Sequence, residues 1–233
     1  MVNGSIQVRQ IEVGDIPHAV TLHRDVLDVE FLARCGERYL RRYYRAWIES
    51  QGAISLAAVD DNGVLCAVLL GAVDTGGHMS AMVKSHGVAL GVSLAGFAIT
   101  HPRFGKELLV TRWRRYANGI WRIARESLGK RQDNRPSVGS PAASSVGEIT
   151  HLLVDRSHQG SGVGRLLVDH AESIAQSHGV EEMTLVTPPE MAARKFYERL
   201  GWEVDGTLTS RSGEEFVKYR HRITKPMGLP PAM

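Results

Sequence analysis

One stretch of the sequence, residues 148–179, constrains the fold more than any other. It reads EITHLLVDRSHQGSGVGRLLVDHAESIAQSHG, in which an apolar strand leads into a glycine-rich turn. After the turn, apolar residues recur at helical spacing, at Val163, Leu166, Leu167, Ala171, Ile174 and Ala175. The order predicts a strand, a turn that needs glycine, and an amphipathic helix that ends at Gly179.

The glycine turn between this strand and this helix favours a phosphate ligand. The first turn of a helix carries unpaired backbone N–H groups, and the helix dipole adds positive potential there. Glycine also lets a ligand lie against the backbone. Two other phosphate motifs are excluded, because Arg165 stands where a dinucleotide fingerprint requires glycine, and no Lys-Ser or Lys-Thr pair follows the last glycine as in a P-loop.

The remaining pattern, Q-x-x-G-x-G from Gln159 to Gly164, resembles the pyrophosphate-binding motif of the GNAT superfamily of acyl-CoA-dependent N-acyltransferases. A second segment, MAARKFYERLGW at 191–202, is similar to that superfamily's A-x-x-F-Y-x-x-x-G-F signature, with Trp202 in place of Phe. The resemblance covers residues 148–223. It implies a single α/β domain whose mixed, mostly antiparallel sheet is flanked by helices, with acetyl-CoA as the acyl donor and no metal.

The resemblance also implies which residues hold the cofactor. Leu152 and Val154 would pair through their backbones with the pantetheine amides, and N–H groups near Leu152 and Leu153 would polarise the thioester carbonyl. The turn would hold the pyrophosphate, with added charge from Arg165. The full predicted set is Leu152, Leu153, Val154, Gln159, Gly160, Ser161, Gly162, Val163, Gly164 and Arg165.

Two side chains are the predicted catalytic groups. Glu148, six residues before Val154, is placed like the general-base glutamate of histone-type members, and a carboxylate suits the removal of a proton from an ammonium acceptor. In relatives the tyrosine matching Tyr197 donates a proton to the leaving CoA thiolate. The alternatives are a solvated strand-edge acid for Glu148, His151 as the base, and a core aromatic for Tyr197.

Composition places the chain among ordinary globular proteins. It has 233 residues, a hydrophobic content of 43% and a charged content of 23%, enough for one domain with a substantial core. Its two cysteines, Cys35 and Cys66, form no disulfide framework or metal-ligand cluster. The N-terminus lacks the apolar core of a signal peptide. These features predict a cytoplasmic protein in which Cys66 is a small buried hydrophobe.

Periodicity and turn signals predict the remaining elements. They are a strand at 5–13, a helix capped by Asp15 and running to Leu27, a helix at 30–49, a hairpin of strands at 53–60 and 64–73, a strand at 183–187, a last helix from Glu190, and a hairpin of strands at 202–209 and 214–223. The tail from Thr224 to Met233 is expected to be loose.

An insertion of about seventy residues, 76–146, separates the third strand from the fourth, and the CoA-binding core follows at 147–223. Its part at 79–99 is apolar, but Lys84 and His86 leave only about thirteen uncharged residues, fewer than a bilayer span needs. From His78 to Arg131 there are ten Lys or Arg and two Glu, a net charge of +8 against +3 for the whole chain. This excess fits a solvated helical face, a lid for an anionic acceptor, or contact with an anionic membrane surface.

These features predict an N-acyltransferase that moves an acetyl group to a primary amine by direct attack in a ternary complex. The run FLARCGERYLRRYYRAW and the basic insertion are also similar to bacterial GNAT proteins of surface-sugar biosynthesis, which implies an amino sugar or another small acceptor. The alternatives are a protein or peptide acceptor and a non-catalytic acyl-CoA sensor or scaffold. Leu185 replaces the glutamate of ribosomal-protein acetyltransferases, no nucleic-acid reader motif is present, and a homodimer stays open.

Overall fold

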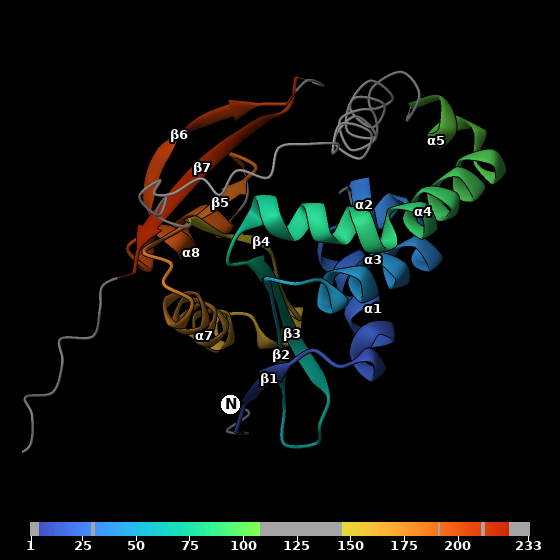
Figure 1. Ribbon diagram of the computed structural model, residues 1–233. Coiled ribbons are helices and arrows are strands. Elements are labelled where there is room, and N and C mark those ends of the chain that lie inside the picture. Colours follow the sequence, from blue (N-terminus) through green and yellow to red (C-terminus); the bar gives the residue numbers. More distant parts are fainter. Residues whose placement is uncertain (1–4, 29–30, 108–145, 191, 211–212, 224–233) are drawn as a thin grey trace, which may run out of the picture.

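The computed structural model describes residues 5–28, 31–107, 146–190, 192–210 and 213–223 of the chain, and Figure 1 gives its element labels. The strands are β1 (Gln7–Gln10), β2 (Ala53–Val59), β3 (Leu65–Ala72), β4 (Val146–Val154), β5 (Glu182–Thr187), β6 (Glu203–Thr209) and β7 (Glu215–Arg222). The helices are α1 (Ile16–Val26), α2 (Phe31–Arg34), α3 (Glu37–Glu49), α4 (Thr75–Thr100), α5 (Pro102–Glu107), α7 (Val163–Ser177) and α8 (Ala193–Arg199), with single 3-10 turns at Val13–Asp15 and Arg156–His158.

The strands form one seven-stranded sheet in the order β1-β2-β3-β4-β5-β7-β6. Every neighbouring pair is antiparallel except β4 and β5, which run parallel. Helix α7 makes the crossover between these two strands, as parallel neighbours require. The predicted mixed, mostly antiparallel sheet flanked by helices is confirmed.

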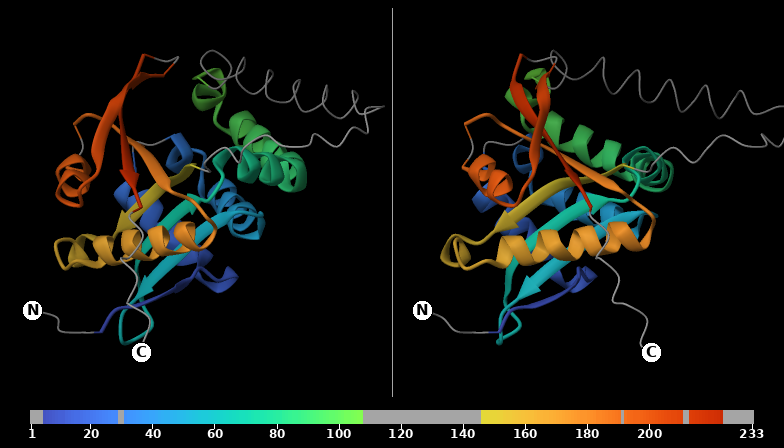
Figure 2. Two further views of the ribbon diagram at one scale, coloured as in Figure 1. Left: turned by 60° about the vertical axis from the view of Figure 1, so that its left-hand side comes forward. Right: turned by 90° about the vertical axis from the view of Figure 1, so that its left-hand side faces the viewer.

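Two hydrophobic cores lie on opposite faces of this sheet. One joins α1, α3, α4 and α5 to the face that carries Val68, Leu70 and Leu153. The other joins α7 and α8 to the opposite face, which carries Leu69 and Ile149. The side views show α7 on one face of the sheet, with α3 and α4 on the other (Figure 2). The alternation of side chains along β3 therefore supplies both cores.

Strands β4 and β5 pair along only part of their length. Their register runs from Val146 opposite Glu182 to Ile149 opposite Leu185 and then stops. Beyond that point β4 continues to Val154 beside β3, and β5 continues to Thr187 beside β7. The sheet therefore opens between two adjacent strands, immediately before the glycine turn.

The N-terminal region differs from the prediction in two places. Strand β1 is shorter than 5–13. Asp15 is the N-cap residue of α1, but its side chain makes no capping hydrogen bond, because its carboxylate accepts hydrogen bonds from the Arg9 guanidinium (2.6 Å) and the Glu12 amide. The hydrogen bond from Arg9 lowers the pKa of Asp15. The Asp15 side chain therefore links β1 to the turn before α1.

The single helix predicted at 30–49 is wrong, since α2 and α3 are separate helices. The chain breaks at Gly36, whose φ is 86° and whose missing Cβ would lie 2.7 Å from a ring carbon of Phe97 on α4. A left-handed backbone and so close an approach both require glycine. Sequence periodicity could not reveal this break, because Phe97 is 61 positions away along the chain.

The insertion begins with α4, an unbroken helix of 26 residues. By length and composition alone α4 could cross a membrane, because an 18-residue window has a mean hydropathy of 1.4. The expectation that Lys84 and His86 leave too short a span is therefore corrected: both lie within the helix and do not interrupt it. Helix α4 crosses α3 (Figure 1) and buries Met82, Leu90 and Leu94 in the core between them.

Most of the other predicted elements are confirmed, including the β2–β3 hairpin at Asp61-Asn62-Gly63 and the β6–β7 hairpin. The last helix begins at Ala193 instead of Glu190, which is exposed in the turn before it. Residues 108–145, with most of the basic part of the insertion and its Ser- and Pro-rich end, lie outside the described residues, as does the tail 224–233. The insertion and core boundaries of 76–146 and 147–223 stay predictions.

Candidate active site

A β-bulge in β4 decides which side chains face the site. Leu70 of β3 lies opposite His151, but Gly71 lies opposite Ile149, so Thr150 is an extra residue without a partner in the register. Paired residues point to the same face of a sheet. Glu148, opposite Ala72, and His151, opposite Leu70, therefore occupy successive positions on one face. Regular alternation would have placed them on opposite faces.

The predicted base Glu148 lies where the sheet divides. It is half-buried, opposite Thr184 of β5, one pair before the β4–β5 pairing ends. Its face of the sheet is the one covered by α1, α3 and α4, and α4 also contacts β4. Its carboxylate makes no hydrogen bond or ion pair with any residue that the structure describes. An acid in this position can accept a proton at the opening between the two strands.

His151 belongs to a buried aromatic cluster on the same face of the sheet as Glu148. Its ring lies 5.1 Å from that of His23 on α1 and 6.1 Å from that of Tyr43 on α3, measured between ring centroids. His23 is fully buried, and its Nδ1 lies 3.1 Å from the Tyr44 hydroxyl oxygen. Sequence reasoning missed His23. The available signal was its spacing, because His23 falls on the same helical stripe as the buried apolar residues of α1.

The hydrogen-bond pattern of β4 tests the predicted backbone contacts. The Asp155 amide donates to the Cys66 carbonyl, which makes 155–66 a hydrogen-bonded pair. Because such pairs alternate in an antiparallel ladder, Leu153 directs its N–H and C=O toward β3, whereas Leu152 and Val154 direct theirs toward the opening. The backbone groups of Leu152 and Val154 therefore line the opening. Those of Leu153 do not, which differs from the predicted cofactor-binding set, because its amide faces β3 and its side chain is buried in the core of α1 and α3.

The glycine turn holds the conformation that its sequence indicated. Gly160 and Gly162 have φ values of 77° and 94°. The first helical hydrogen bond runs from the Leu166 amide to the Gly162 carbonyl (3.1 Å), which leaves the amides of Val163, Gly164 and Arg165 at the open end of α7. Three N–H groups and the positive end of a fifteen-residue helix therefore point into the turn.

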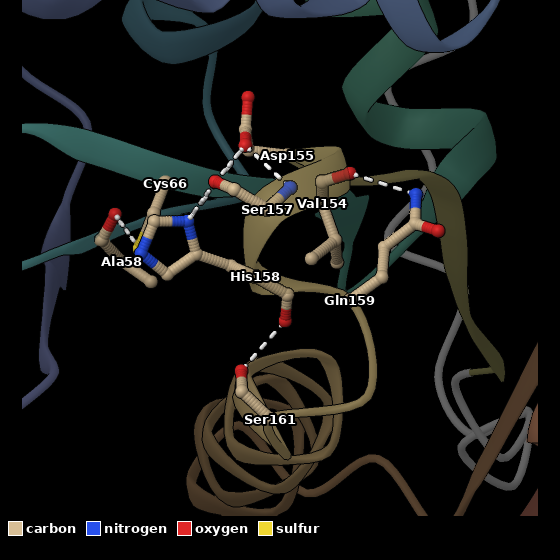
Figure 3. Close-up of polar contacts among 8 residues, drawn as sticks. All are labelled: Ala58, Cys66, Val154, Asp155, Ser157, His158, Gln159 and Ser161. Atoms are coloured by element: carbon tan, nitrogen blue, oxygen red, sulfur yellow. Dashed lines mark hydrogen bonds and ion pairs between the residues drawn. The ribbon is translucent and has the colours of Figure 1, made fainter. Parts of the chain in front are cut away.

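Side chains around the turn stabilise it from within, as Figure 3 shows. The Gln159 amide nitrogen donates to the Val154 carbonyl (3.2 Å), and the Ser161 hydroxyl donates to the His158 carbonyl (2.6 Å). The Ser157 hydroxyl and amide both donate to Asp155, and these hydrogen bonds lower the pKa of that carboxyl. Gln159 and Ser161 thus shape the glycine turn, and the Val154 carbonyl oxygen already accepts one hydrogen bond.

The helix start packs tightly against its neighbours, while its charge stays accessible. A Cβ on Gly164 would lie 3.3 Å from the Phe196 ring of α8 and 3.6 Å from Val154, so glycine permits close packing of α7, α8 and β4. The Arg165 side chain is exposed on the first turn of α7. It is therefore accessible to an anion at the turn, and its contact with the pyrophosphate stays a prediction.

Tyr197 of α8 is buried in the core on the α7 face. Its ring lies 5.0 Å from Phe196 and 5.6 Å from Trp202, and its hydroxyl makes no hydrogen bond within the described part of the chain. Burial raises the pKa of Tyr197 above its ordinary value. The phenol therefore stays protonated at neutral pH, which a proton donor requires. The core packing of the ring, the alternative interpretation, is present as well.

The two cysteines have the surroundings of structural residues. Both are buried, and the Cys66 thiol lies 3.2 Å from the Ala58 carbonyl oxygen and the Cys35 thiol 3.2 Å from that of Phe31. Burial raises the pKa of Cys66, which opposes formation of a thiolate nucleophile. The prediction of a small buried hydrophobe is confirmed. Within the described ranges, no group of three or more His, Cys, Asp or Glu could hold a metal ion.

Several solved structures of acetyltransferases share the fold of this chain. A spermidine N-acetyltransferase chimera from Vibrio cholerae aligns with a TM-score of 0.56 at 12% identity, over 94% of this chain and 95% of its own. The ribosomal-protein-S18-alanine N-acetyltransferase from Escherichia coli aligns with a TM-score of 0.53 at 12% identity, over 97% and 99%. A GCN5-related N-acetyltransferase from Kribbella flavida aligns with a TM-score of 0.52 at 15% identity, over 93% and 97%. At these identities the likeness shows the fold alone.

The family is shown by the sequence match that accompanies this fold. The family described as "Acetyltransferase (GNAT) family" matches residues 24–202, more than half of the chain. The match includes the opened β4 strand, the glycine turn and Tyr197. The chain therefore belongs to the GNAT family of acetyltransferases.

Proposed function

We propose that this acetyltransferase moves the acetyl group of acetyl-CoA directly to the primary amine of a small molecule, with Glu148 as the general base and Tyr197 as the general acid. The observation that carries the proposal is the position of Glu148. Its half-buried carboxylate stands at the point where β4 parts from β5, on the strand that leads into the anion cradle. Donor and acceptor can therefore meet beside one carboxylate.

The cofactor fits the residues around the opening. The amides of Val163, Gly164 and Arg165, with the Arg165 guanidinium, would hold the pyrophosphate. Leu152 and the Val154 amide offer backbone groups along the free edge of β4, where the pantetheine arm would lie as a short extra strand. Bound acetyl-CoA supplies the activated thioester; the remaining chemistry is proton transfer and charge stabilisation by the protein.

The proposed reaction has two proton transfers. Glu148 accepts a proton from the acceptor ammonium, directly or through one water, and the neutral amine attacks the thioester carbon. The Leu152 amide, directed toward the opening, would stabilise the negative charge that develops on the carbonyl oxygen. When the carbon–sulfur bond breaks, Tyr197 would donate its proton to the leaving thiolate. Both cysteines stay outside this sequence.

An amino sugar carrying a nucleotide is the proposed acceptor. The net charge of +8 between His78 and Arg131 supports an anionic substrate. Most of those arginines fall in 108–145, so a lid role for that segment stays a prediction. A protein or peptide amine is the second acceptor class, since the Escherichia coli neighbour is named for a ribosomal protein. Against it stands Leu185, a buried residue at the position where that class has glutamate.

The experiment that tests this proposal is CoA release from acetyl-CoA by the full chain. Nucleotide amino sugars, peptides, polyamines and aminoglycosides would be compared at equal concentration. We expect the highest kcat/KM with a nucleotide amino sugar. Preference for a peptide or a polyamine would replace the acceptor class but keep the chemistry. Binding of acetyl-CoA without turnover on any amine would favour an acyl-CoA sensor or scaffold and overturn the proposal.

A further inference from the structure

The outward face of α4 carries the most exposed large hydrophobic side chains among the described residues. Val88 is 84% exposed, Ile99 81% and Val92 65%, and no other described large hydrophobic residue exceeds 56%. Their spacing of four and seven places them on one stripe of the helix. A soluble helix normally presents polar residues to solvent on this side. So regular an exposed stripe indicates a contact surface.

The opposite side of α4 is firmly held. Met82, Leu90 and Leu94 are buried in the core that α4 shares with α3, and the Phe97 ring packs edge-on against Phe104 of α5 at a centroid distance of 5.2 Å. His78 is buried with its ring 4.4 Å from that of Trp47. Crossing a bilayer would expose this core to lipid and bury His78 without its partners. The helix can instead lie flat, with only its outer stripe in contact with a partner.

Charge around the stripe selects the partner. Between Asp74 and Glu107, which bound this part of the chain, there is no Asp or Glu, and the exposed cations Lys84, Arg103 and Lys106 lie near the ends of the stripe. Arg42 of α3 adds a fourth beside it, donating to the Ala89 carbonyl (3.1 Å). On α3 both acids are already paired, Glu37 with Arg41 and Glu49 with Arg45. The surroundings of the apolar stripe are therefore cationic.

We propose that the Val88–Val92–Ile99 face of α4 docks in the plane of an anionic lipid surface. Aliphatic side chains would enter the boundary between headgroups and acyl chains, and Lys84, Arg103 and Lys106 would meet the lipid phosphates. A second copy of the chain fits less well. A two-fold interface sets the same patch against itself and would bring these cations together around an apolar contact. The inference does not depend on which amine is acetylated.

The test is sedimentation of the full chain with vesicles of phosphatidylglycerol and phosphatidylcholine, against vesicles of phosphatidylcholine alone. We expect binding to the anionic vesicles that weakens as salt is raised. The triple variant Val88→Asn, Val92→Asn, Ile99→Asn should lose about tenfold or more of that affinity. A matched triple variant of exposed residues elsewhere, Val64→Asn, Val204→Asn, Leu208→Asn, should retain it.

A second measurement reports the position of the helix directly. Because Cys35 and Cys66 are both buried, Val92→Cys provides an accessible thiol for an environment-sensitive fluorophore. Its emission should shift to the blue with anionic vesicles, while a label at Val64→Cys should not shift. Absence of binding at low salt, equal binding by both triple variants, or a concentration-dependent dimer abolished by the α4 triple variant without lipid binding would each overturn the proposal.

Discussion

Helices α7 and α4 are the two longest helices among the described residues, and their surfaces differ in character. Helix α7 buries Val163, Leu167 and Ala171 and exposes polar residues such as Asp169, so its useful feature is its N-terminal end. Helix α4 is apolar on both sides, and its outward stripe is bare. A helix that acts through its N-terminal end can keep a polar outer face. A helix with an apolar outer face is expected to pack that face against a partner.

The largest loss of activity is expected at the candidate active site and not in the insertion. Glu148→Gln keeps the size of the side chain but removes the proton acceptor, so kcat should fall by about 10²- to 10⁴-fold. The Kd for acetyl-CoA should change little, because the cradle on α7 is intact. Steady-state kinetics and calorimetry measure the two quantities. The exposed Glu181→Gln is the matched control, and equal losses in both variants would remove Glu148 from the mechanism.

The effect of Tyr197→Phe should be smaller and should depend on chemistry instead of packing. Loss of the proton donor should lower kcat by roughly ten- to a hundredfold, with cofactor binding retained. Since burial raises the pKa of Tyr197, its acid form persists above the ordinary pKa of tyrosine. The kcat of the wild type should therefore show no fall up to pH 10 from this group. Full activity of the Phe variant would leave Tyr197 as a core aromatic only.

The contact between Gly36, which precedes α3, and Phe97 of α4 should be the point most sensitive to substitution where the insertion packs against the rest of the domain. Gly36→Ala forces a side chain into a positive φ and to within 2.7 Å of Phe97, so the free energy of unfolding should fall by about 2–4 kcal/mol. Denaturant unfolding measures it. Gly14→Ala, where the new Cβ meets nothing within 4 Å, should change stability by less than about 1 kcal/mol. A similar change in the free energy of unfolding for the two variants would show that the Phe97 ring moves aside at little cost.

A glycine-to-alanine substitution should change the stability of the protein in opposite directions in the two helices. Gly162→Ala at the start of α7 meets no neighbour but retains a φ of 94°, and should cost about 1–2 kcal/mol and weaken acetyl-CoA binding. Gly91→Ala within α4 also meets no neighbour and should stabilise the protein by about 0.5–1 kcal/mol, because alanine favours a helix. Thermal unfolding of both variants checks the pair. If both variants were destabilised, or both stabilised, backbone conformation would not explain the difference between the two sites.

The agreement with sequence was greatest where the signal is local. The glycine turn, the helix to Ser177 and the two hairpins depend on residues close together in the chain, and they were predicted with small errors of boundary. The break at Gly36 was missed because its cause, Phe97, comes from another helix. The outer face of α4 was missed for a similar reason. Periodicity shows which residues are apolar but not which side a neighbouring helix covers.

At the candidate site, the sequence by itself determined the residue types and the conformation of the glycine turn, because glycine conformation and helix ends are set by local geometry. Only the tertiary structure decided which of these groups meet. The Thr150 bulge brings Glu148 and His151 to one face, the ladder turns Leu153 away from the opening and Leu152 toward it, and α1 supplies His23. A single extra residue in a strand reverses every later side chain, and hydrogen-bond pairing across strands fixes which edge is open.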